Sequence, residues 1–223
     1  MTMIMKQLKL HIKFHYKAIL IFWIVALLVK NTLSISSLNR INVDFLQDIL
    51  NNTSMIISFF IIVSTFTIQG DEFRLVVSFG VTRLQFLIGS ICYFILQAAV
   101  FALLQVIFLQ NVFYNVGNIS INWYTIEKIF VQFLFYITLA SLFQLILVSK
   151  QRFQWIGLAV GGTVFLGLTS AFYGEVGLSG LGFKIEGELV NVPYFLIISI
   201  SLTAMYFVIS SIMVRKISFE DTI

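Results

Sequence analysis

Charged residues are scarce in this chain, and proline and cysteine are almost absent. Charged residues make up 11% of the 223 residues and hydrophobic residues 59%, against about 25% and about 45–50% in a typical soluble domain. A soluble protein of this length could not bury so much apolar surface. The composition therefore excludes a soluble domain and predicts a polytopic membrane protein.

Recognisable enzyme motifs are also lacking. The sequence has no H-E-x-x-H, no G-x-S-x-G and no phosphate-binding G-x-x-x-x-G-K-[ST]. The single cysteine, Cys92, lies inside an apolar run, which excludes a disulfide framework. His11 and His15 have the i,i+4 spacing of metal ligands on a helix, but no cysteine or carboxylate joins them locally. We therefore predict no catalytic residue, no metal site and no cofactor bound by this chain.

Long apolar runs are what the sequence has instead. Because they are apolar on all sides rather than alternating, they predict membrane-spanning helices and not barrel strands. The result is one all-α transmembrane domain over residues 1–223, in which six runs are long enough to span. They are residues 14–33 around an apolar core at 18–29, 53–68, 84–109, 129–148, 153–172 and 194–214.

Residues 1–17 form a basic segment before the first span. Lys6, Lys9, Lys13 and Lys17 share one arc of a helix, and apolar residues share another. This pattern predicts an amphipathic helix in the cytoplasmic headgroup layer, with its lysines toward anionic lipid. A signal-peptide leader is the alternative, although no A-x-A cleavage site follows.

Lysine and arginine are distributed unevenly between the two sides that six spans would create. Ten lie on the side of the termini and four on the other, which predicts that both termini are cytoplasmic in a multi-pass protein of the cell membrane. The net charge of +4 then reflects basic cytoplasmic loops, and no nucleic-acid partner is expected. Residues 173–193 are external, glycine-rich and amphipathic, so we expect them to re-enter the outer leaflet; a plain external loop remains open.

Uncharged polar and small residues within the spans have two possible roles. Ser58 and Thr65 fall close to one face of the second span, with Phe59 and Phe66 near it, and Gln97, Gln105, Gln132 and Gln144 lie in the next two spans. They either form interhelical hydrogen bonds or line a path for an amphipathic substrate. Gly157 and Gly161 form a GxxxG motif that favours close helix packing, within the chain or against a second chain.

Residues 69–83 form the most distinctive connection between spans. Asp71, Glu72, Arg74 and Arg83 alternate there with apolar residues that include Phe73 and Phe79. A loop that only reversed direction would not need this pattern. It predicts a short amphipathic element at the membrane surface, pressed against a partner and ended by Gly80.

This element and the layout around it resemble permease subunits of ABC transporters of the type-2 exporter class. The similarity lies in Asp71–Arg74, Ser78–Arg83 and Phe86–Gly89, and Gly80 replaces a proline common in the family. The layout of basic helix, six spans and external segment extends the resemblance over nearly the whole chain. The resemblance implies that residues 69–83 contain a coupling helix that contacts an ATPase subunit, through Glu72, Phe73, Arg74, Phe79, Gly80 and Arg83.

The resemblance also implies partners and a substrate path. ATP and magnesium would be bound by a separate ATPase subunit, and a second permease chain, identical or different, would complete the transporter. The path would run between the second and fifth spans, near Ser58, Phe59, Thr65, Phe66, Gly157 and Gly161.

The expected substrate is apolar or amphipathic, such as a peptide, toxin, drug or lipid. In size and style the chain resembles the membrane subunits of exporters of phenol-soluble modulins. The rival prediction is a non-transporting immunity or sensor protein that binds amphipathic peptides.

Overall fold

The chain is a bundle of helices. The computed structural model describes residues 3–36, 53–105, 123–173 and 192–215, and these contain no β-strand. The elements follow one another as α1 (Met3–Ser36), α3 (Thr53–Thr67), the π-helix η2 (Ile68–Glu72), α4 (Phe73–Ser78), α5 (Arg83–Leu104), α6 (Trp123–Tyr173) and α7 (Val192–Val214). Five of the described helices are long and apolar enough to cross a membrane, which confirms the all-α prediction.

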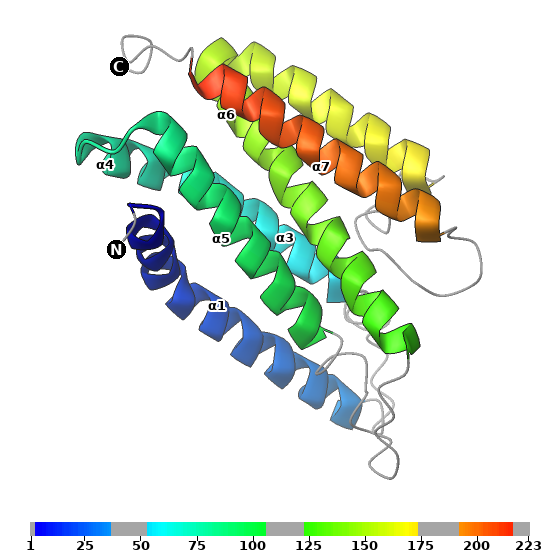
Figure 1. Ribbon diagram of the computed structural model, residues 1–223. Helices are drawn as coiled ribbons and strands as arrows, with labels where there is room; N and C mark the ends of the chain where they lie inside the picture. The colour runs from blue at the N-terminus through cyan, green and yellow to red at the C-terminus, as the bar shows by residue number, and fades with distance from the viewer. Residues whose placement is uncertain (1–2, 37–52, 106–122, 174–191, 216–223) are drawn as a thin grey trace.

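The bundle has a central layer and two flanks. Helices α3, α5 and the first part of α6 pack together, α1 lies against α5, and α7 lies against α6 (Figure 1). Their shared core is aromatic and aliphatic, with Phe94, Phe101 and Tyr136 among its fully buried side chains. Because the core lies between α1, α3 and α5, it fixes the chain on both sides of the 69–83 element.

Helix α6 consists of two helices that meet at a sharp turn. Gln154 has φ 53° and ψ −130°, outside helical geometry, and the second limb returns beside the first (Figure 1). A side chain at Gly157 would collide with the backbone carbonyl of Ser149, and one at Gly161 with the side chain of Ile146. The two glycines therefore permit the close approach of the two limbs.

The helix bounds agree with most of the predicted spans and change one boundary. Residues 1–17 and the first span were expected as separate helices, but α1 runs without a break from Met3 to Ser36. Intrahelical hydrogen bonding continues because no glycine or proline interrupts this stretch. The re-entrant segment predicted at 173–193 lies almost entirely outside the described residues.

The outer surface of the bundle is apolar. Leu20, Ile21 and Ile24 on α1, and Ile197 and Val208 on α7, are among many large hydrophobic side chains that are exposed. Water would not support so much exposed apolar surface, whereas lipid chains would. The described helices are thus consistent with a multi-pass membrane protein.

Candidate functional site

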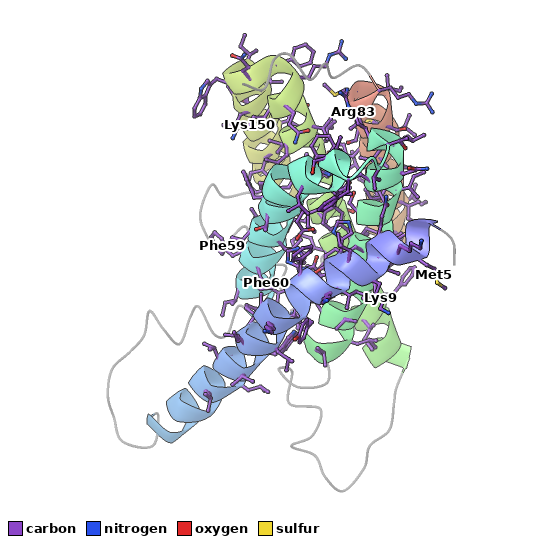
Figure 2. All side chains as sticks on the ribbon, turned by 90° about the vertical axis from the view of Figure 1, so that its left-hand side faces the viewer. Met5, Lys9, Phe59, Phe60, Arg83 and Lys150 are labelled. Carbon is purple, nitrogen blue, oxygen red and sulfur yellow. The ribbon has the colours of Figure 1, made fainter. Side chains whose placement is uncertain are left out.

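The connection between α3 and α5 presents two different faces. Phe73 and Val76 of α4 are buried against the bundle, whereas Leu75 is exposed and Phe79 is 74% exposed. Figure 2 shows the chain leaving α3 and turning toward Arg83 at the start of α5. The outward pair offers apolar surface to a partner, and the inward pair holds α4 in place.

The end of α4 and the start of α5 are fixed by local backbone chemistry. Gly80 has φ 82°, a left-handed conformation that favours glycine, and α4 ends two residues before it. Thr82 then caps α5: its side chain accepts a hydrogen bond from the backbone N–H of Gln85, and the Gln85 side chain accepts one from the backbone N–H of Thr82. The turn that presents Phe79 is therefore rigidly defined, and the predicted break at Gly80 is confirmed.

A buried carboxylate connects this element to the N-terminal helix. One oxygen of Glu72 lies 2.6 Å from Nδ1 of His11, and the other lies 2.6 Å from Nε2 of His15. All three side chains are buried. Because a carboxylate has two oxygens and can take two donors, one residue of η2 joins two successive turns of α1. We call His11, His15 and Glu72 the histidine–carboxylate clasp.

Helix α1 approaches α5 closely beside the clasp. Gly89 of α5 leaves room for the Gln7 side chain of α1, because a Cβ at Gly89 would collide with Gln7 Oε1. The aromatic ring of Tyr93 lies 5.7 Å from the His11 ring and 5.4 Å from the His15 ring, measured between centroids. The clasp is thus covered by α5 as well as by η2.

A second contact connects the same element to the turn within α6. The Gln151 side chain donates a hydrogen bond of 2.6 Å to the backbone carbonyl of Gln69 in η2. Arg152 and Lys150 flank Gln151, and Figure 2 shows Lys150 and Arg83 at the same end of the bundle. The π-helix η2 is therefore held by α1 through Glu72 and by α6 through Gln69.

Two residues predicted to contact an ATPase lie inside the bundle instead. Glu72 and Phe73 are both 7% exposed, because the clasp and the shared core draw them inward. Of the other residues assigned to coupling, Phe79 and Gly80 are exposed, Arg83 is half-buried, and the Arg74 side chain lies outside the described side chains. The surface open to a partner is accordingly centred on Leu75 and Phe79.

The residues proposed for a substrate path do not share one environment. Ser58 and Thr65 are fully buried, and the Thr65 hydroxyl donates to the Ile61 carbonyl. Phe59 and Phe66 are exposed on another side of α3. Gly157 and Gly161 face the first limb of α6, so this glycine pair packs within the chain.

Several glutamines in the spans form the interhelical hydrogen bonds that were one of their two predicted roles. Gln97 accepts from the Ser64 hydroxyl at 3.4 Å, Gln144 donates to the Ser90 hydroxyl at 2.9 Å, and Gln105 accepts from the Tyr136 hydroxyl. These pairs hold α5 to α3 and α6.

Sequence reasoning missed the clasp, although a signal was present. Gln7, His11 and His15 recur every four residues, on a different arc from the lysines, and this polar stripe is the face of α1 that becomes buried. Within the described ranges no group of three or more His, Cys, Asp or Glu side chains could hold a metal ion. The clasp is a contact between helices in which each carboxylate oxygen of Glu72 faces one histidine nitrogen of α1.

Comparison with known proteins gives a family but no activity. A family model with the description "Protein of unknown function (DUF4052)" matches residues 4–220. No curated protein and no solved structure matches the chain.

Proposed function

We propose that this chain, which belongs to the DUF4052 family, is the membrane-spanning subunit of an ATP-driven exporter of apolar or amphipathic substrates. A separate ATPase subunit of the ATP-binding-cassette class supplies the energy, because the chain has no phosphate-binding loop of its own. A second permease chain completes the pathway.

The observation that carries the proposal is the exposed pair Leu75 and Phe79 on a fixed turn. A large aromatic side chain that is 74% exposed is the kind of anchor that partner proteins bury. The turn is joined to α1 through the clasp, to α6 through Gln69, and directly to α3 and α5. A displacement of this turn by a partner would therefore reach four helices.

The proposed topology has six spans with both termini in the cytoplasm. The apolar stretch Ile129–Phe165 of α6 is 37 residues long, nearly twice the ~20 residues needed to cross a bilayer, and it reverses at Gln154. Leu87, Val148 and Val214 pack together, so the start of α5, the end of the first limb of α6 and the end of α7 lie at one level. Basic residues Arg83, Lys150, Arg152 and Arg215 gather near this level, which favours the cytoplasmic side.

The test is co-purification of the chain with its native partners from its own membrane. We expect an ATPase subunit with a phosphate-binding loop in the complex, and we expect Leu75→Ala/Phe79→Ala to remove it while the chain stays inserted. Phe130→Ala is the matched control, because Phe130 is an exposed aromatic residue of α6 outside this turn. Retention of the ATPase by the double variant would reject the coupling surface. A complex without any ATPase would favour the non-transporting immunity or sensor protein.

A further inference from the structure

A groove lies between α1 and α3, beside the clasp. Its volume is about 400 Å³, within the range of small-molecule sites. The apolar part of its wall comes from Phe14 and Ala18 on α1, Phe60 and Val63 on α3, and Leu75 on α4. Phe14, Val63 and Leu75 are exposed, so the groove opens at the apolar outer surface.

The other part of the wall is polar and gathers around Glu72. His15, Ser64 and Thr67 line the groove together with that carboxylate. The groove thus has an apolar side and one polar corner. This arrangement matches an amphiphile that has an apolar chain and a small polar head. Figure 2 shows Phe60 where α1 crosses α3, and Phe59 on another side of α3.

Most of the hydrogen-bonding atoms that remain available in this corner are acceptors. They would bind a ligand that donates hydrogen bonds. The Thr67 hydroxyl already donates to the Val63 carbonyl, so it can still accept. The buried Ser64 hydroxyl donates to Gln97 and also faces the Tyr93 hydroxyl. Glu72 receives one contact on each oxygen, and each oxygen keeps a further lone pair. The lining contains no lysine or arginine.

This inventory selects one head group. A primary ammonium has three N–H donors, no acceptor and a positive charge, which complements acceptor oxygens around a carboxylate. A carboxylate or phosphate head would meet acceptor oxygens and Glu72 without a lysine or arginine to balance its charge.

We propose that this groove binds an amphiphile with a primary ammonium head, placed at Glu72 and Thr67, and an apolar chain along Phe60 and Val63. The inference concerns binding alone and goes beyond the proposed export function. It stands if the chain transports the amphiphile and equally if it only senses it.

The test uses the full chain in phosphatidylcholine vesicles, whose lipids carry no primary ammonium. The probes are a dodecylammonium, a dodecanol and a dodecanoate of equal length, each with the same photoreactive group on the chain. After illumination, labelled residues are mapped by mass spectrometry. We expect the ammonium probe to label α1 and α3 at the groove at least about tenfold more than the alcohol, as a charged hydrogen bond contributes.

Variants locate the site. Val63→Trp fills the apolar part of the groove and should abolish this labelling, whereas Val208→Trp, at a similarly exposed valine on α7, should leave it unchanged. Glu72→Gln should reduce the preference for ammonium over alcohol. Equal labelling by ammonium and alcohol, stronger labelling by dodecanoate, or labelling spread over all outer helix faces and insensitive to Val63→Trp would each overturn the proposal.

Discussion

Glu72 is the residue on which the arrangement of the N-terminal helix depends most directly. A buried carboxylate is costly unless it is hydrogen-bonded or paired, and here both of its contacts come from α1. Removal of one histidine leaves one oxygen of the buried Glu72 carboxylate without its partner. The cost of that loss can be measured because the exposed lysines of the same helix provide a comparison.

We expect His11→Ala and His15→Ala each to destabilise the protein by about 1–3 kcal/mol, the cost of an unsatisfied buried polar group. Lys13→Ala, between them but exposed, should change stability by no more than about 0.5 kcal/mol. Equilibrium unfolding in mixed detergent measures both. If His11→Ala resembled Lys13→Ala, Glu72 would not depend on this partner.

A double-mutant cycle separates pairing from packing. His11→Ala combined with Glu72→Ala should cost less than the sum of the two single changes, because the second change removes a group already left without its partner. Additive costs would show that the residues contribute only as packed volume.

The polar stripe on α1 was visible in the sequence, but its pairing with Glu72 was not, because the two lie far apart along the chain. His11 and Glu72 are 61 residues apart, and no local rule connects them. The end of α4 was predictable, because glycine readily adopts the left-handed backbone conformation found at Gly80. The sequence shows that Glu72 lies on an amphipathic segment, but it does not show which side of that segment faces the bundle. Glu72 was therefore predicted to face a partner.

At the scale of elements, the hairpin within α6 depends on its glycines. Gly157 faces the backbone of the first limb, which cannot move aside as a side chain could, whereas Gly162 has open space around it. The two positions lie on one helix and differ only in what they face.

We expect Gly157→Ala to separate the two limbs and to destabilise the protein by about 1–3 kcal/mol, the usual cost of overpacking. Gly162→Ala should be neutral or should stabilise the helix by about 0.5–1 kcal/mol through its higher helix propensity. Thermal unfolding of the purified chain provides the comparison. Equal effects of the two changes would contradict the packing assigned to Gly157.

The hydrogen bond from Gln151 to the Gln69 carbonyl has its own test. Gln151→Leu keeps the side-chain volume but loses the donor, so η2 and α4 should open more often. Hydrogen exchange of the amides in α4 should become faster by roughly fivefold to tenfold, as the loss of about 1 kcal/mol implies. As the control, Lys150→Ala at the exposed neighbouring position should leave hydrogen exchange in α4 unchanged. If Gln151→Leu also left the exchange rate unchanged, α6 would not hold the turn.

The long apolar helices were predictable because hydropathy sums over about 20 residues and needs no knowledge of neighbours. The role of Gly157 and Gly161 was not, because a GxxxG motif packs equally well against the same chain or another. The boundary expected near residue 17 failed for a related reason. A change from amphipathic to apolar composition alters the surroundings of a helix without breaking its backbone hydrogen bonds.

At the scale of the whole molecule, an apolar outer surface is combined with basic residues near one level of the bundle. By the positive-inside rule, this combination favours a cytoplasmic position for the end that carries the basic residues. Ser78, at the end of α4, is exposed and reports on that end directly.

We expect a cysteine at Ser78, in a Cys92→Ser background, to resist a membrane-impermeant thiol reagent in intact cells and to react in opened vesicles. Cysteines at Ser37 and Ser179, predicted outside from the distribution of lysine and arginine, should react in intact cells. Labelling at Ser78 in intact cells would reverse the orientation and remove the proposed ATPase contact.

The π-helix η2 has a consequence for how this protein tolerates changes of length. The N–H of Phe73 bonds to the carbonyl of Ile68, five residues back, so the segment holds one residue more than an α-helix would need. Each added residue rotates the remainder of a helix by about 100°. Deletion of Gly70 would let this segment become α-helical, with little change in the rotation of α4 relative to α3. Phe79 and Leu75 would keep their exposed side, and Phe73 and Val76 their buried side. Deletion of a residue within α3, which has no extra residue to lose, would instead turn α4 by about 100°.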